Sequence, residues 1–210
     1  NFTAFKTGDY AADIEHIGNA LSVLGKKGIA TAPVVTDMAT RMSGVLGTFK
    51  VTAGQTLGLS AAMQEMGITV ERGSTAVTKL VQKMAQNPEV FAKVAGAKTK
   101  KEIEEFIKLL NEDAVAALLK VAQGSKIASN NTVEYAAILK ELESTGAGVS
   151  EVLAKFADNN FLVKQKVDLA TDAIAKNDTI QNSFAISNEN VAAKVSKLQK
   201  QFAALWESQA

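Results

Sequence analysis

His16 is the only histidine of the chain, and it is the first residue whose chemistry could support catalysis or metal binding. Histidine serves as a general base and as a metal ligand. No Gly-x-Ser-x-Gly motif supplies a nucleophile for it to activate. A transition-metal site without cysteine or a second histidine would need several carboxylates. A lone histidine on an amphipathic helix is more often structural or exposed to solvent, and we favour that interpretation.

Carboxylates are dense at two places in the sequence. Glu102, Glu104 and Glu105 form one cluster, and Glu112 with Asp113 forms the other. We expect both at or near helix N-termini, where acidic side chains stabilise the positive end of the helix dipole. That role accounts for both clusters without catalysis.

Phosphate and nucleic-acid sites have equally weak signals. The sequence Leu-Gly-Lys-Lys at 24–27 is similar to the end of a phosphate-binding loop, but the earlier glycine and the following Ser or Thr are missing. Aromatic residues fall at core spacings and are not interleaved with basic residues, as single-strand binding requires. We therefore expect no catalytic residues, no metal, no cofactor, no specific nucleic-acid binding and no enzymatic activity.

Composition limits the classes of partner and compartment. The chain has 210 residues, of which 47% are apolar and 21% charged, and its formal net charge of +1 suggests no strongly electrostatic partner. The absence of cysteine excludes disulfides and thiolate metal sites. No stretch reaches the roughly 18 apolar residues of a membrane span. The first residue is Asn1 rather than Met, so we expect a piece of a longer polypeptide.

Helical signals recur along the whole chain. Apolar residues repeat at helical spacing, strict alternation is rare, and two capping boxes are recognisable at Thr52–Gln55 and Thr99–Glu102. We predict an all-α fold: a compact bundle of short helices with a long C-terminal helix or helix pair. The expected divisions are an amphipathic lead-in helix at 1–29, a compact core domain at 30–158 and an extended C-terminal segment at 159–210.

Small residues recur every four positions at Ala39, Ser43 and Gly47, and again at Gly54 and Gly58. Such spacing lets two helix backbones approach closely. It could serve a self-association face or a membrane-active hairpin. The alternative, which we favour, is tight packing inside the bundle, because both segments are too short and too polar to span a bilayer.

The C-terminal region carries a heptad pattern, in which apolar residues fall alternately four and three apart, except where the polar residues Asn177, Gln181 and Asn188 occupy the apolar slot. A period of 3.5 is typical of a coiled coil or of a long helix lying on a partner. The members are Val163, Val167, Ala170, Ile174, Phe184, Val191, Val195, Leu198, Phe202 and Leu205. The first half of this region is apolar over a broad arc, which fits docking onto the chain's own core.

The second half narrows to a strict stripe, which we name the seam and define as Val191, Val195, Leu198, Phe202 and Leu205. We predict that the seam mediates self-association, with Asn188 as a candidate residue for fixing its register. Residues 177–188 could be continuous helix or a turn between two helices.

Several stretches, taken in order, resemble the core region of phage tail tape measure proteins, over about residues 12–210. No single stretch is specific, and the ordered series carries the likeness. The stretches are 32–44, 55–62 (QTLGLSAA), 67–68, 71–76 (ERGSTA), 91–96 (FAKVAG), 106–113 and 182–198. Many family members carry an arginine near the turn equivalent to Gly146–Gly148. This sequence has none there, so no role for that arginine is carried over.

The resemblance implies a structural component of a phage or prophage tail, a tape measure fragment that sets tail length and occupies the lumen of the tail tube. It implies a homo-oligomer with tail tube, tail-tip or tail assembly chaperone proteins as partners. It also implies assembly in the host bacterial cytoplasm and residence in the virion tail. The alternative is a helical binding module that docks an unrelated partner through its C-terminal helix.

Overall fold

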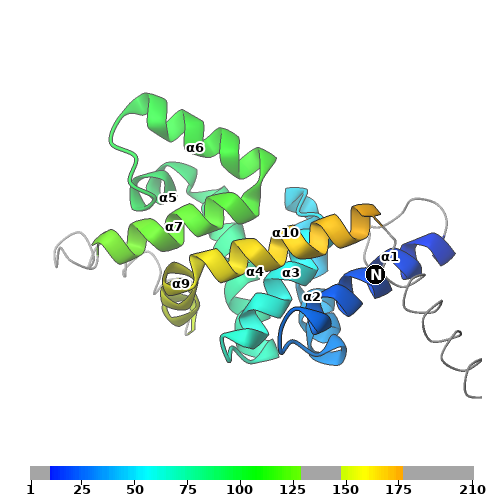
Figure 1. Ribbon diagram of the computed structural model, residues 1–210. Helices are drawn as coiled ribbons and strands as arrows, with labels where there is room; N and C mark the ends of the chain where they lie inside the picture. Colours follow the sequence, from blue (N-terminus) through cyan, green and yellow to red (C-terminus); the bar gives the residue numbers. More distant parts are fainter. Residues whose placement is uncertain (1–9, 129–147, 177–210) are drawn as a thin grey trace, which may run out of the picture.

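The computed structural model describes residues 10–128 and 148–176, and every regular element within them is a helix (Figure 1). The prediction of an all-α fold is therefore confirmed for this part of the chain. The elements are α1 (Tyr10–Lys26), α2 (Ala32–Leu46), the 3-10 turn η2 (Gly47–Phe49), α3 (Ala53–Glu65), α4 (Val70–Gln86), α5 (Pro88–Val94), α6 (Lys100–Glu112), α7 (Ala114–Ala128), α9 (Val149–Asp158) and α10 (Asn160–Lys176).

Both predicted capping boxes are confirmed. At the start of α3 the Thr52 hydroxyl accepts from the Gln55 N–H at 3.2 Å, and the Gln55 side chain accepts from the Thr52 N–H at 2.9 Å. Thr99 and Glu102 exchange the same pair of bonds at the start of α6. Each box satisfies N–H groups that have no partner within the first turn of a helix.

Two helix boundaries differ from expectation. The apolar spacing of Val115, Leu118 and Ala122 predicts a helix capped by Asn111. Instead α6 continues through Glu112, so Glu112 stands at a helix C-terminus. Asp113 separates α6 from α7, because its carboxylate accepts from the Ala116 N–H at 3.0 Å and so caps α7. The sequence also predicts Ser150 as the N-cap of a later helix. Instead α9 begins at Val149, after Gly148 in the left-handed region at φ 97°.

Helix α3 lies at the centre of the molecule. All of its residues from Ala53 to Met63 except Gln55 are buried, because α1, α2, α4 and α10 pack around it. A helix that is buried on all sides carries apolar or small residues on every face and is not amphipathic. Figure 1 shows α10 running alongside α3, and this is the most extensive contact between two helices in the described part of the chain.

The buried apolar residues form two clusters. The main cluster joins α2, α3, α4, α5, α6, α7, α9 and the first turn of α10, and its large members include Met42, Leu59, Leu80, Phe91 and Phe156. The second cluster joins α1, α2, α3 and α10, and its buried members are Ala20, Leu24, Ala30, Val35, Ala39, Ala53, Leu57, Ala61, Ala170 and Ala173.

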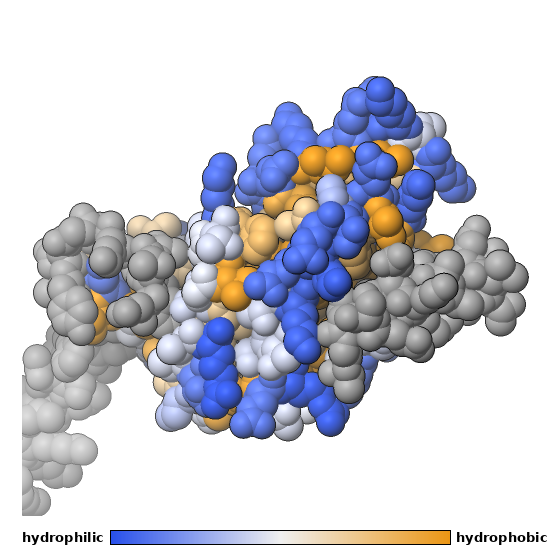
Figure 2. All heavy atoms as spheres, turned by 180° about the vertical axis from the view of Figure 1, so that it is seen from behind, coloured by the Kyte–Doolittle hydropathy of each residue, from blue (hydrophilic) through white to orange (hydrophobic). Residues whose placement is uncertain are grey.

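Helix α6 is the most peripheral helix of the core, since its main contacts are with α5 and α7. Phe106 and Leu110 are buried on its inner side. Seen from behind in Figure 2, hydrophilic side chains cover the top of the molecule, where α6 lies, and apolar atoms show beneath them. A helix that packs on the core with one side only is expected to be amphipathic, as α6 is.

Helix α10 packs on α3 and α1, as the broad apolar arc of its sequence indicated. Its buried face differs in detail from the predicted stripe, because Lys166 and Ala173 are buried whereas Val167 and Ile174 are half-buried. The division at 158/159 into core and extended segment stays a prediction, since residues 177–210 lie outside the described part of the chain.

Candidate functional site

The seam predicted for self-association cannot be placed. Its five residues, Val191, Val195, Leu198, Phe202 and Leu205, lie outside the described residues, and so does Asn188. The same holds for the choice between helix and turn at 177–188. It also holds for residues 131–144, where the spacing of Val133, Ala137 and Leu142 predicts a helix. These stay predictions.

His16 makes a structural contact. Its Nδ1 lies 2.6 Å from the backbone oxygen of Ile174 near the end of α10. A carbonyl oxygen only accepts, so this geometry assigns the proton to Nδ1. One helical turn further along α1, the Asn19 amide donates to the Ala173 oxygen. The two side chains fasten α1 to the last turns of α10, in keeping with the structural interpretation of His16.

The acidic cluster on α6 serves the helix itself. The Glu102 carboxylate accepts from the N–H groups of Lys98 at 2.7 Å and Thr99 at 2.8 Å, and these backbone hydrogen bonds lower the pKa of Glu102. Glu104 and Glu105 are exposed and lie 3.9 Å from lysines one turn earlier. The carboxylates of this cluster therefore engage helix groups and do not converge on a common point.

Asp113 also has a structural role. Its Oδ1 accepts from the Gln55 side-chain amide at 3.0 Å as well as from the Ala116 N–H, and so it ties the start of α3 to the start of α7. Among the described residues, no group of three or more His, Asp or Glu side chains is placed to hold a metal ion. None of the described helices is long and apolar enough to cross a membrane.

The glycine pair on α3 is used inside the molecule. A Cβ at Gly54 would lie 2.6 Å from the Cα of Thr171, and a Cβ at Gly58 would lie 2.4 Å from the Lys166 oxygen and 2.5 Å from the Cα of Val167. Both glycines thus let the α10 backbone touch α3. For Gly54 and Gly58, the structure therefore supports tight packing inside the bundle rather than a self-association face or a membrane-active hairpin.

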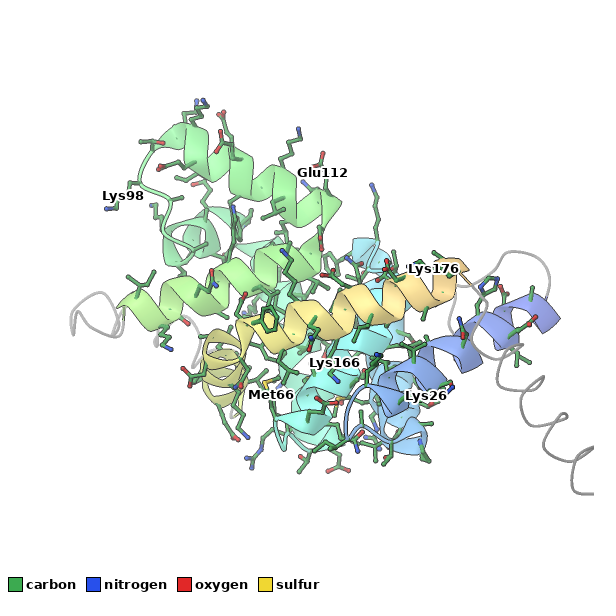
Figure 3. The ribbon with its side chains drawn as sticks, in the orientation of Figure 1. Lys26, Met66, Lys98, Glu112, Lys166 and Lys176 are labelled. Atoms are coloured by element: carbon green, nitrogen blue, oxygen red, sulfur yellow. The ribbon has the colours of Figure 1, made fainter. Side chains whose placement is uncertain are left out.

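A buried ion pair joins three segments at the centre of this contact. The Lys166 Nζ lies 2.7 Å from the Glu65 carboxylate, and the two side chains are only 2% and 11% exposed. The same Nζ donates to the Lys27 oxygen at 3.0 Å, and Glu65 accepts from the Ile29 N–H at 3.1 Å. Figure 3 shows Lys166 midway along α10, on the side facing α3 and the turn after α1.

Sequence reasoning missed this pair, although a signal for Lys166 was present. Val163, Lys166, Ala170 and Ala173 are spaced three, four and three apart, so Lys166 occupies a slot on the buried side of the helix. A lysine in such a slot is seldom fully buried unless a partner neutralises it. Its partner Glu65 could not be identified from the sequence, because the two residues belong to helices that are distant along the chain.

No protein-family model, no curated protein and no solved structure matches this chain. Its function is therefore argued from the sequence and from the arrangement above. The ionisable groups described above are occupied with capping, pairing and fastening helices. Within the described part of the chain, these groups join helices to one another or cap their ends.

Proposed function

We propose that this chain is a structural part of a phage or prophage tail: a fragment of the tape measure protein that sets tail length and occupies the lumen of the tail tube. The observation that carries the proposal is the ordered series of stretches between Ala32 and Asp113 that resembles this family. The proposal assigns no reaction and no cofactor to the chain.

The position of those stretches in the fold supports the proposal. They fall on α2 to α6, where residues such as Met42, Leu57, Phe91 and Phe106 are buried. A shared helical core would need such residues, because buried positions determine packing. The same stretches also include exposed residues such as Glu71, Arg72 and Thr75. Surface likeness alone would carry less weight, since short polar helical stretches recur in unrelated proteins.

The proposed role explains the need for a rod after the core. Each helical residue adds about 1.5 Å of length, so a long helical protein can measure a tube. In the proposed arrangement the seam at 191–205 joins several copies in the lumen. The chain would assemble in the host bacterial cytoplasm with tail tube, tail-tip or tail assembly chaperone proteins and remain in the virion tail.

The test is affinity capture with the whole chain as bait, from phage-infected or lysogenic bacterial cells, followed by mass spectrometry. We expect tail tube, tail-tip or tail assembly chaperone proteins among the captured proteins. The matched control bait carries Leu198→Asp, which places a charge in the seam while leaving the described residues unchanged. If the control bait still captures tail proteins but no longer captures further copies of its own chain, the seam serves self-association.

A second candidate function rests on the same seam. A seam at 191–205 could form half of a hetero-coiled coil with an unrelated partner, such as a chaperone or a secretion component. The capture experiment separates the two functions. Recovery of one such partner, lost in the Leu198→Asp bait and without any tail protein, would favour the binding module and contradict the tail role.

A further inference from the structure

Helix α1 belongs to only one of the two apolar clusters. Ala20 and Leu24 are buried in the second cluster, and Ile17, Leu21 and Val23 pack against it. Among residues 12–26 of α1, whose burial the structure describes, none contributes to the main cluster. Removal of α1 from its place would therefore uncover part of the second cluster and leave the main cluster intact.

The buried members of the second cluster are mostly smaller than those of the main cluster. Seven of its ten buried members are alanine. An alanine removes one methyl group from water, whereas each leucine, methionine or phenylalanine of the main cluster removes several carbon atoms. The apolar free energy that holds α1 is therefore small compared with the free energy that holds the main cluster together.

Polar contacts hold α1 through His16 and Asn19, which bind backbone oxygens of α10, and the Lys166–Glu65 pair holds the turn that follows α1. Lys166 binds the Lys27 oxygen, and Glu65 binds the Ile29 N–H, while the two side chains bind each other at 2.7 Å. The pair is almost excluded from water in this position. Loss of one partner leaves a buried charge, which is costly until the surrounding segment opens and admits water.

Gly28 allows the turn to close over the pair. A Cβ at this position would lie 1.8 Å from the Glu65 Oε1 atom and 2.2 Å from the Lys166 Nζ atom. A side chain there cannot coexist with the ion pair in its observed geometry. An alanine at position 28 would therefore push the turn away from Lys166 and Glu65 without changing any charge.

We propose that Lys166 and Glu65 act as a latch for α1: while the pair is closed, α1 stays on α10 and α3, and when it opens, α1 leaves as a unit while the main cluster stays folded. Local opening of this kind is expected where few apolar contacts and several solvent-replaceable polar contacts hold an element. Release uncovers the side of α10 that carries Ala173 and Ile174, next to the point where the chain continues to residue 177.

Hydrogen exchange of the whole chain, read by mass spectrometry, tests the latch. In Lys166→Met and, independently, in Gly28→Ala, we expect the amides of α1 to exchange about a hundredfold faster than in the unsubstituted chain. The amides of α4 and α9, which belong to the main cluster, should keep their protection. The two variants open the latch by different means, loss of charge and steric contact.

Two control variants match these changes. Arg72→Met removes one member of an exposed ion pair whose atoms are also 2.7 Å apart, between Arg72 and Glu151. Gly44→Ala adds a methyl group where no atom lies within 4 Å of the new Cβ. Neither control should change the exchange of α1.

Two results would overturn the proposal. If α1 and α4 lose protection by the same factor in both latch variants, the helices unfold as one unit and α1 is not separately released. If α1 keeps its protection in both variants, Lys166 and Glu65 do not hold it in place. If one latch variant does not fold, and α1 and α4 lose protection by the same factor in the other variant, this outcome also counts as the first result.

Discussion

Lys166 shows how a single residue can join segments that are distant along the chain. Burial of a lysine is unfavourable unless hydrogen bonds and an opposite charge replace water. Here Glu65 supplies the charge and the Lys27 oxygen supplies a further acceptor. Gly28 leaves room for the amine, because a Cβ at that position would lie 2.2 Å from the Lys166 Nζ atom.

Gly58→Ala should destabilise the protein, although alanine favours helices more than glycine does. The added Cβ would lie 2.4 Å from the Lys166 oxygen, so α10 would have to move away from α3. We expect a loss of about 1–3 kcal/mol in the free energy of unfolding, measured by urea denaturation.

Gly44→Ala is the matched control for Gly58→Ala. It lies in α2 with open space around it and should gain about 0.5–1 kcal/mol from helix propensity. Equal effects of the two substitutions would contradict the close contact of α3 and α10.

The capping box at Glu102 predicts a pH dependence. Because backbone hydrogen bonds lower the pKa of Glu102 in the folded protein, its stabilising effect is complete above the ordinary carboxyl pKa of about 4.3 and is lost as the pH falls through the lowered value. Glu102→Ala should therefore lower the melting temperature at neutral pH and have little effect in strong acid, as followed by circular dichroism. Glu104→Ala is the control. A melting-temperature difference for Glu102→Ala that is constant with pH would contradict this role.

At the scale of elements, local chemistry made most helices predictable. Thr52 and Thr99 mark helix starts because their hydroxyl groups satisfy particular N–H groups, and this chemistry needs no tertiary contact. The start of α7 was misplaced because Asn111 and Asp113 are both plausible caps in the sequence. Only the fold, which also places Gln55 against Asp113, decides between them.

The central position of α3 gives a prediction about core packing. Leu59 is fully buried in the main cluster, whereas Ile127 is 72% exposed at the end of α7. Leu59→Ala should lower the free energy of unfolding by about 2–5 kcal/mol, because a cavity remains where the side chain was. Ile127→Ala should change it by less than about 0.5 kcal/mol. Urea unfolding of both variants measures the difference, and equal losses would place Leu59 outside the core.

At the scale of the whole molecule, periodicity predicted which faces of the helices are apolar but not which helices meet. The sequence indicated that residues 163–176 dock onto the chain's own core, yet it did not identify α3 as the partner or α1 as the cover. Pairing depends on shape, here on Gly54 and Gly58 facing α10, and on contacts between residues far apart in sequence. The candidate seam at 191–205 depends on contacts with another chain, which a single sequence does not specify.

We propose that this chain works by associating with other helical proteins, beginning with copies of itself. Sedimentation equilibrium of the whole chain tests that claim most directly, with Leu198→Asp as the comparison. We predict an average mass that rises above the 22.2 kDa of one chain as concentration increases, and that falls back to this value in the variant. A mass of one chain at every concentration, identical in both proteins, would contradict self-association through the seam.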